Sequence, residues 1–133
     1  MTRKRVASGS PYEKEYGFSR AVSVGDRILL GGTAPIWPND VVDPSVTEQT
    51  KRCLQIILAC LDKLGAGPEH VVRTRIYLTD REDADLVGAV HGEVFDEIRP
   101  VTSMVVVAGL LDPRWKVEIE AEAVLTLPDE EAS

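Results

Sequence analysis

The chain has 133 residues, of which 44% are hydrophobic and 28% charged, and its net charge is −7. This length suits one domain that buries a core without metals or disulfides. The negative charge repels phosphate groups, which argues against nucleic acid and against an anionic membrane surface as partners. We recognise neither a signal peptide nor an apolar run of membrane length, so we expect a cytoplasmic protein with no membrane partner.

Cysteine and histidine usage agrees with that location and gives no sign of a metal site. Cys53 and Cys60 fall in a predicted helix, with backbones about 10 Å apart along its axis, too far for a disulfide. Reduced cysteines are typical of the cytosol. His70 and His91 have no recognisable ligand spacing from the cysteines. We therefore expect no metal and no cofactor.

The N-terminal part is predicted to contain two strands and an irregular connection. The basic start, residues 3–5, has no apolar stretch behind it and is expected to be a solvated terminus. Residues 18–24 and 27–30 are typical of strands around a two-residue turn. Gly31 and Gly32 interrupt the second strand, where the backbone must bend or approach another group closely. Residues 33–44 form an irregular connection.

Two helices follow, each with a capping-box pattern at its start. Ser45 and Glu48 form the first box, and Thr79 and Glu82 form the second. The apolar stripes comprise Cys53, Leu54, Ile57, Cys60, Leu61 and Leu64 in the first helix, and Leu86, Val90, Val94, Phe95 and Ile98 in the second.

The remaining strands differ in pattern. Residues 73–78 alternate between apolar or threonine side chains and Arg, Arg and Tyr. The run 105–107 is three consecutive valines, which is typical of a strand buried on both faces. The last segment, VEIEAEAV, alternates strictly and places Glu118, Glu120 and Glu122 on one side.

This order, β-β-α-β-α-β-β, predicts a single α+β domain with two helices on one face of one sheet. The strand-helix-strand unit should join parallel neighbours by a right-handed crossover. The opposite face must be covered or tolerably polar, and Arg73, Arg75 and the glutamates of the last strand suit a polar, partly paired surface.

Several segments, in this order, resemble the YjgF/RidA family: YGFSRAVSVG, ILLGGTAP, the capped helix, VVRTRIYLTD and a close that runs from Pro-x-x-Ser to VEIEAEAV. The resemblance implies one domain over residues 1–133, with a core of about 16–126, and the chorismate-mutase-like fold of that family. It also implies a homotrimer that covers the open sheet face, with a cleft for a small-molecule ligand between subunits.

Members of this family include imine and enamine deaminases, and the resemblance assigns site residues by position. Phe18 matches an aromatic residue that packs on the substrate, and Glu118 a glutamate that helps activate water. The family's strand-end turn beside the cleft corresponds to Gly31, Gly32 and Thr33, and the strand backbone that positions the substrate to Ser103 and Met104. Thr102 stands where the family usually has an arginine that grips the substrate carboxylate, which is a loss of charge, geometry and reach.

Two functions follow as hypotheses. The first is hydrolysis of a small reactive imine or enamine to a carbonyl compound and ammonia, in a site altered at Thr102. The alternative is a non-catalytic member that binds a small metabolite or is regulatory. A third interpretation, ribonuclease-like inhibition of translation, is the one that the charge of −7 disfavours most.

Each candidate residue also has a simpler interpretation. Glu118 could belong to an exposed acidic strand face, Phe18 could fill the core, and Thr102 could be a β-former that opens a strand. Arg20 lies two residues from Phe18, so in one strand both side chains would share a face, and Arg20 could replace the missing cation. A solvated surface arginine is the simpler interpretation.

Overall fold

The computed structural model describes residues 2–126, which form one six-stranded mixed sheet with its two long helices on one face. The strand order is β1-β2-β3-β6-β4-β5; β4 and β5 are parallel, and all other neighbours are antiparallel. The strands are β1 (Arg3–Val6), β2 (Ala21–Val24), β3 (Arg27–Thr33), β4 (Val71–Leu78), β5 (Val101–Val106) and β6 (Val117–Val124). The helices are α1 (Tyr12–Tyr16), α2 (Val46–Lys63) and α3 (Ala84–Phe95), with 3-10 turns at Pro38–Asp40, Pro68–His70 and Arg81–Asp83.

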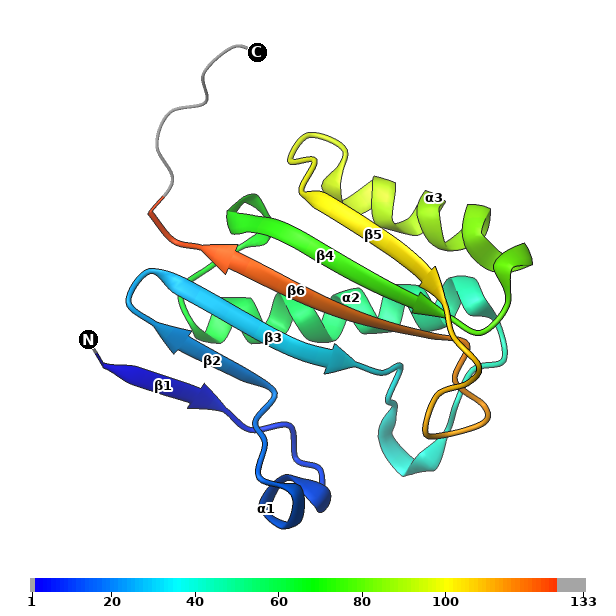
Figure 1. Ribbon diagram of the computed structural model, residues 1–133, viewed down its shortest axis with the longest axis horizontal. Coiled ribbons are helices and arrows are strands. Elements are labelled where there is room, and N and C mark those ends of the chain that lie inside the picture. The colour runs from blue at the N-terminus through cyan, green and yellow to red at the C-terminus, as the bar shows by residue number, and fades with distance from the viewer. Residues whose placement is uncertain (1, 127–133) are drawn as a thin grey trace.

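The core lies between the sheet and α2 and α3, as the sequence pattern predicts. Figure 1 shows α2 crossing behind the central strands. The alternation of β6 is confirmed, because its apolar side chains are buried and its glutamates are not. The expected stripe of α2 is buried up to Leu61, and Leu64 packs partly buried against it. The α+β class and the single domain are thus confirmed.

Local signals set the bounds of α2. The backbone N–H of Glu48 donates to Ser45 Oγ (3.2 Å), so Ser45 is the N-cap that the sequence predicts. At the other end Gly65 adopts a left-handed conformation (φ 79°), and the Ala66 N–H donates to Leu61 O. Cys53 and Cys60 are free and buried.

The prediction of a second capping box at Thr79 and Glu82 is wrong. Asp80, not Thr79, accepts a hydrogen bond from the Glu82 backbone N–H (2.9 Å), and it caps a 3-10 turn that precedes α3. This turn shifts the helical phase, so Val87 is fully buried while Leu86, expected in the core, is 51% exposed.

The N-terminal region holds two elements that the sequence pattern does not indicate. Residues 3–5 were expected to be a solvated terminus; their side chains are exposed, but together with Val6 they form β1, an edge strand that pairs antiparallel with β2. The next element, α1, is a single short helix that ends at Gly17 (φ 76°). Strand β2 therefore starts at Ala21 rather than at residue 18, because the Gly17 and Phe18 N–H groups still bond to Glu13 O.

Strand β5 is exposed along its whole length, contrary to the expectation of a strand buried on both faces. It stands last in the sheet and pairs only with β4, so one backbone edge is free within the described residues. Its exposed apolar side chains are Val101, Met104, Val105 and Val106. No helix in the described part of the chain is long and apolar enough to cross a membrane.

Candidate functional site

The sheet face away from the helices carries a polar surface in which arginines pair with glutamates. Arg75 lies 3.5 Å from Glu120, and Arg73 lies 3.9 Å from Glu122. The Tyr77 hydroxyl also donates to Glu120. This partly paired surface is the one expected from the sequence. One glutamate of β6 takes part in none of these pairs.

That glutamate is Glu118. Within the described part of the chain its carboxylate has no hydrogen-bond or ion-pair partner, although Glu120 and Glu122 on the same strand do. Burial, and secondarily the charge of Glu120, raises the pKa of the Glu118 carboxyl above its usual value. A half-buried carboxylate without a partner and with a raised pKa is able to serve as a general base.

The glycine pair of β3 leaves room for this carboxylate. Register between β3 and β6 shifts between Leu30 and Thr33, so Gly31 and Gly32 form a bulge. A Cβ placed on Gly32 would be 2.9 Å from Glu118 Oε1, closer than side-chain carbons normally approach an oxygen. The bend and the close approach expected at these glycines are therefore both present. Thr33, fully buried, donates from Oγ1 to Gly31 O (3.0 Å) and holds the bulge.

Phe18 and Arg20 lie near this end of the sheet in the turn before β2, and not within a strand as expected. Phe18 is 43% exposed and lies in the turn after α1, so it does not fill the core. The Arg20 guanidinium is 3.5 Å from Ser8 O and near Glu13, whose pKa is lowered chiefly by hydrogen bonds from Ser8 and to a lesser extent by the charge of Arg20. The backbone O of Arg20 accepts from the Gly31 N–H (2.9 Å), which ties this turn to the bulge. The shared strand on which the Arg20 argument rested is absent.

Thr102 is turned away from the polar sheet face. Its register partner on β4 is Thr74, which is buried beneath the helices, and the two hydroxyl oxygens are 2.8 Å apart. Thr102 Oγ1 also donates to Pro100 O (3.2 Å). That bond uses the only hydrogen of the Thr102 hydroxyl, so the Thr74 hydroxyl donates to Thr102 Oγ1. His91 Nε2 lies 2.8 Å from Thr74 Oγ1 and must therefore donate to it.

His91 is the residue of this region that the sequence did not indicate. Burial lowers the pKa of His91, so the ring is neutral near pH 7 with its proton on Nε2. The hydrogen-bonded chain His91–Thr74–Thr102–Pro100 spans α3, β4 and β5, and a single-sequence pattern does not connect them. Of the neighbouring residues, Ser103 pairs with Arg75 and faces the polar side, whereas Met104 pairs with Ile76 on the helix side.

The structure thus gathers the candidate residues into two groups. Glu118, Gly31, Gly32 and Thr33 meet where β3 and β6 pair, with the Phe18 turn beside them. Thr102, Ser103 and Met104 lie on β5, on the far side of β4. A hollow of about 230 Å³ opens on the polar face beside the first group; it is lined by Leu29, Leu30, Gly31, Arg73, Arg75, Glu120, Ala121 and Glu122.

Similar proteins place this fold in a family. The model of the family described as Endoribonuclease L-PSP matches residues 10–125. An uncharacterised protein of Streptomyces coelicolor is 43% identical over 90% of each chain.

Solved structures agree with that assignment. A Mycobacterium tuberculosis member of the YjgF/YER057c/UK114 family is 42% identical, with a TM-score of 0.85 over 92% of this chain and 99% of that one. Escherichia coli TdcF, solved with bound serine, is 25% identical, with a TM-score of 0.79 over 92% and 94% of the two chains. The chain therefore belongs to the Endoribonuclease L-PSP family, which is the YjgF/RidA family.

Proposed function

We propose that this protein hydrolyses small reactive imines or enamines to a carbonyl compound and ammonia, with Glu118 as the general base. The observation that carries the proposal is the carboxylate of Glu118: half-buried, unpaired within the described residues, and admitted by Gly32. A contrast among the glutamates of β6 supports the proposal, because Glu120 and Glu122 each form an ion pair with an arginine and Glu118 does not.

The chemistry needs one carboxylate and one water. The substrate reacts as the protonated imine. As the water oxygen bonds to the C=N carbon, Glu118 takes one proton from that water and the C=N electron pair moves to nitrogen, which gives a hydroxy-amine. Glu118 then gives its proton to the amine, and as the C–N bond breaks it takes the hydroxyl proton, so that ammonia leaves and a carbonyl compound remains. A base whose pKa lies nearer to neutrality than that of an ordinary glutamate takes up and returns a proton more readily.

A homotrimer would complete the site. The polar sheet face has no covering element within residues 2–126, and the adjacent free edge of β5 carries apolar side chains. Exposed apolar edge strands are normally covered in native proteins. In the proposed assembly the backbone of Ser103 and Met104 from one copy lies across the cleft from Phe18, the glycine bulge and Glu118 of the next. The serine bound to the related TdcF is a ligand of the size such a cleft would hold.

A second function, binding of a small metabolite without catalysis, is supported by Thr102. Its hydroxyl is held by Thr74 and Pro100, and the Arg20 guanidinium is directed to the Ser8–Glu13 turn. Neither offers a free cation to a substrate carboxylate beside Glu118. A site of this kind would favour neutral or cationic ligands.

Ammonia release tests the proposal, with imines made in situ by an amino-acid oxidase and, for imines without a carboxylate, by an amine oxidase. We expect turnover by the wild type, and a loss of about a hundredfold or more in Glu118→Gln, the range usual for a general base. Glu122→Gln is the matched control, because it changes the same residue type on the same strand face and should keep activity. No turnover across a broad panel of imines, with saturable binding of the corresponding amines or ketones, would favour the binding function instead.

A further inference from the structure

A second hollow, of about 270 Å³, lies between the loop that follows β3 and the loop that precedes β6. Both tryptophans of the chain, Trp37 and Trp115, line it and are half-buried. Tryptophan contributes large binding energies wherever its ring is left accessible in a concave site. The other lining residues are Pro35, Ile36, Asp40, Val41, Val42, Asp112 and Arg114.

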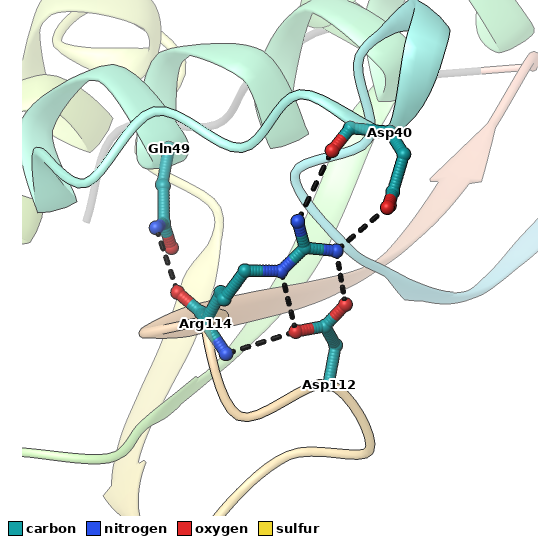
Figure 2. Close-up of polar contacts among 4 residues, drawn as sticks. All are labelled: Asp40, Gln49, Asp112 and Arg114. Carbon is teal, nitrogen blue, oxygen red and sulfur yellow. Dashed lines mark hydrogen bonds and ion pairs between the residues drawn. The ribbon is translucent and has the colours of Figure 1, made fainter.

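The walls of this hollow are held by buried polar contacts. Gln49 of α2 is fully buried; its Nε2 donates to Asp43 O (2.8 Å) and Arg114 O (3.0 Å), and its Oε1 accepts from the Lys116 N–H (2.8 Å). Figure 2 shows the Gln49 amide meeting the backbone of Arg114, with the guanidinium extended between Asp40 and Asp112. One buried amide therefore joins both loops to the helix, and the hollow is pre-formed.

The Arg114 guanidinium joins the same two loops and donates four hydrogen bonds. It donates to Asp112 Oδ1 (3.1 Å) and Oδ2 (2.8 Å), and to Asp40 O (3.1 Å) and Oδ1 (2.8 Å). Asn39 and Asp40 both adopt left-handed conformations (φ 63° and 55°), which direct the Asp40 carboxylate at Arg114. Asn and Asp adopt this conformation more readily than other non-glycine residues, and the contacts of Asp40 with Arg114 hold the loop in it.

The charges at this hollow sum to −1. Hydrogen bonds from Arg114 lower the pKa of Asp112 to about 2, so that carboxylate is ionised at neutral pH. Two carboxylates face one guanidinium, and Asp40 Oδ2 accepts no hydrogen bond from the described residues. Indole rings beside an unmatched negative charge favour an organic cation, because the ring face and the carboxylate attract the same charge.

We propose that this hollow binds a small organic cation of the arylalkyl-ammonium class, with its ammonium group at Asp40 Oδ2 and its apolar part against Trp37 and Trp115. The lining of this hollow does not include Glu118, and binding there does not depend on the proposed hydrolysis. Bound anions are disfavoured here, since Arg114, the one cation among the described residues that line the hollow, is already paired with both carboxylates.

Tryptophan fluorescence tests the site directly, because both tryptophans of the chain lie in it. The probes are phenethylammonium, its neutral analogue 2-phenylethanol and its anionic analogue phenylacetate, titrated into the wild type. We expect a saturable change with phenethylammonium, with a Kd at or below about 1 mM. The alcohol should bind at least about tenfold more weakly, and phenylacetate should show no saturation. No saturable change with the ammonium compound, or equal affinity for the alcohol or the carboxylate, would overturn the proposal.

Variants localise the binding. Asp40→Asn should weaken phenethylammonium binding about tenfold, while Glu97→Gln, an exposed and distant change of the same net charge, should not. Trp37→Leu, measured by the fluorescence of the remaining Trp115, should also weaken binding. If Asp40→Asn unfolds because its pairing with Arg114 is lost, Trp37→Leu alone tests the place of binding. Binding by both pocket variants at the wild-type affinity would contradict the assigned place.

Discussion

The carboxylate of Glu118 occupies the space that a side chain at residue 32 would fill: a Cβ on Gly32 would lie 2.9 Å from Oε1 and 3.1 Å from Cδ. The position of the candidate base therefore depends on a residue of the neighbouring strand having no side chain. The adjacent glycine, Gly31, is not close to the carboxylate in this way, since the atom nearest to a Cβ placed on it would be Arg20 O at 3.8 Å.

This contrast gives a matched pair of substitutions. Gly32→Ala should displace the Glu118 carboxyl by several tenths of an ångström or more and lower imine hydrolysis by about tenfold to a hundredfold, since small misplacements of a reacting group cost rates of that order. Gly31→Ala adds the same methyl group at an ordinary contact distance and should retain activity. Thermal unfolding of both variants controls for stability. Equal activity of the two would show that the carboxyl position is unimportant.

The raised pKa of Glu118 makes a prediction for stability. Its folded pKa lies above the unfolded value near 4.5, so the folded state holds the proton more tightly. The resulting stabilisation is fully present below the unfolded pKa and is lost as the pH rises through the folded pKa. Urea unfolding of Glu118→Gln should therefore show a gain over the wild type at pH 7 that shrinks by pH 4. Glu122→Gln, which removes ion pairs with Arg27 and Arg73, should show no such gain.

The hydrogen-bonded chain beneath α3 predicts a stability effect without a direct catalytic one. Thr74→Val leaves the partly buried His91 Nε2–H without its acceptor, while the exposed Thr102 hydroxyl keeps its bond to Pro100 O. We expect a loss of about 1–3 kcal/mol in the free energy of unfolding, the cost of an unmet buried polar group. Ser103→Ala removes a hydroxyl on the exposed face of the next strand and should change stability by less than about 0.5 kcal/mol. Chemical denaturation measures both.

The exposed edge strand predicts a change of assembly. Val105 is 41% exposed and shares its sheet face with Tyr77, whereas Leu86 is 51% exposed on α3. Val105→Glu should convert the expected homotrimer to monomer in light scattering at micromolar concentration, because a charge would be buried in the interface. Leu86→Glu places the same charge on the helix side and should remain trimeric. A wild-type monomer at that concentration would refute the assembly and the shared cleft together.

Sequence patterns predicted best the elements whose two faces differ within one chain. The alternation of β6 and the stripe of α2 were recognisable because each has one buried and one exposed side. The same logic failed for β5, whose three valines indicate burial that no described residue of this chain provides. The five-residue α1 and the polar edge strand β1 bury little and so leave no periodic signal.

The site was predictable only in outline. Resemblance named Glu118 and the glycine pair, but the sequence does not separate Glu118 from Glu120 and Glu122, because the arginines that pair with the latter two come from other strands. The direction of Thr102 depended on Thr74 and His91, which are distant in sequence. Phe18 and Arg20 were misplaced by a strand boundary, since the end of α1 at Gly17 delays β2 to Ala21.

The pH dependence of kcat/KM for ammonia release tests most directly whether Glu118 is the base. For the wild type we expect the rate to fall as the pH is lowered, with a midpoint above the usual glutamate value near 4.5, as burial of Glu118 requires. In Glu118→Gln the residual rate should lose that midpoint, and in Glu122→Gln the midpoint should persist. A wild-type profile that is flat across this range, or one that Glu118→Gln reproduces, would contradict the account.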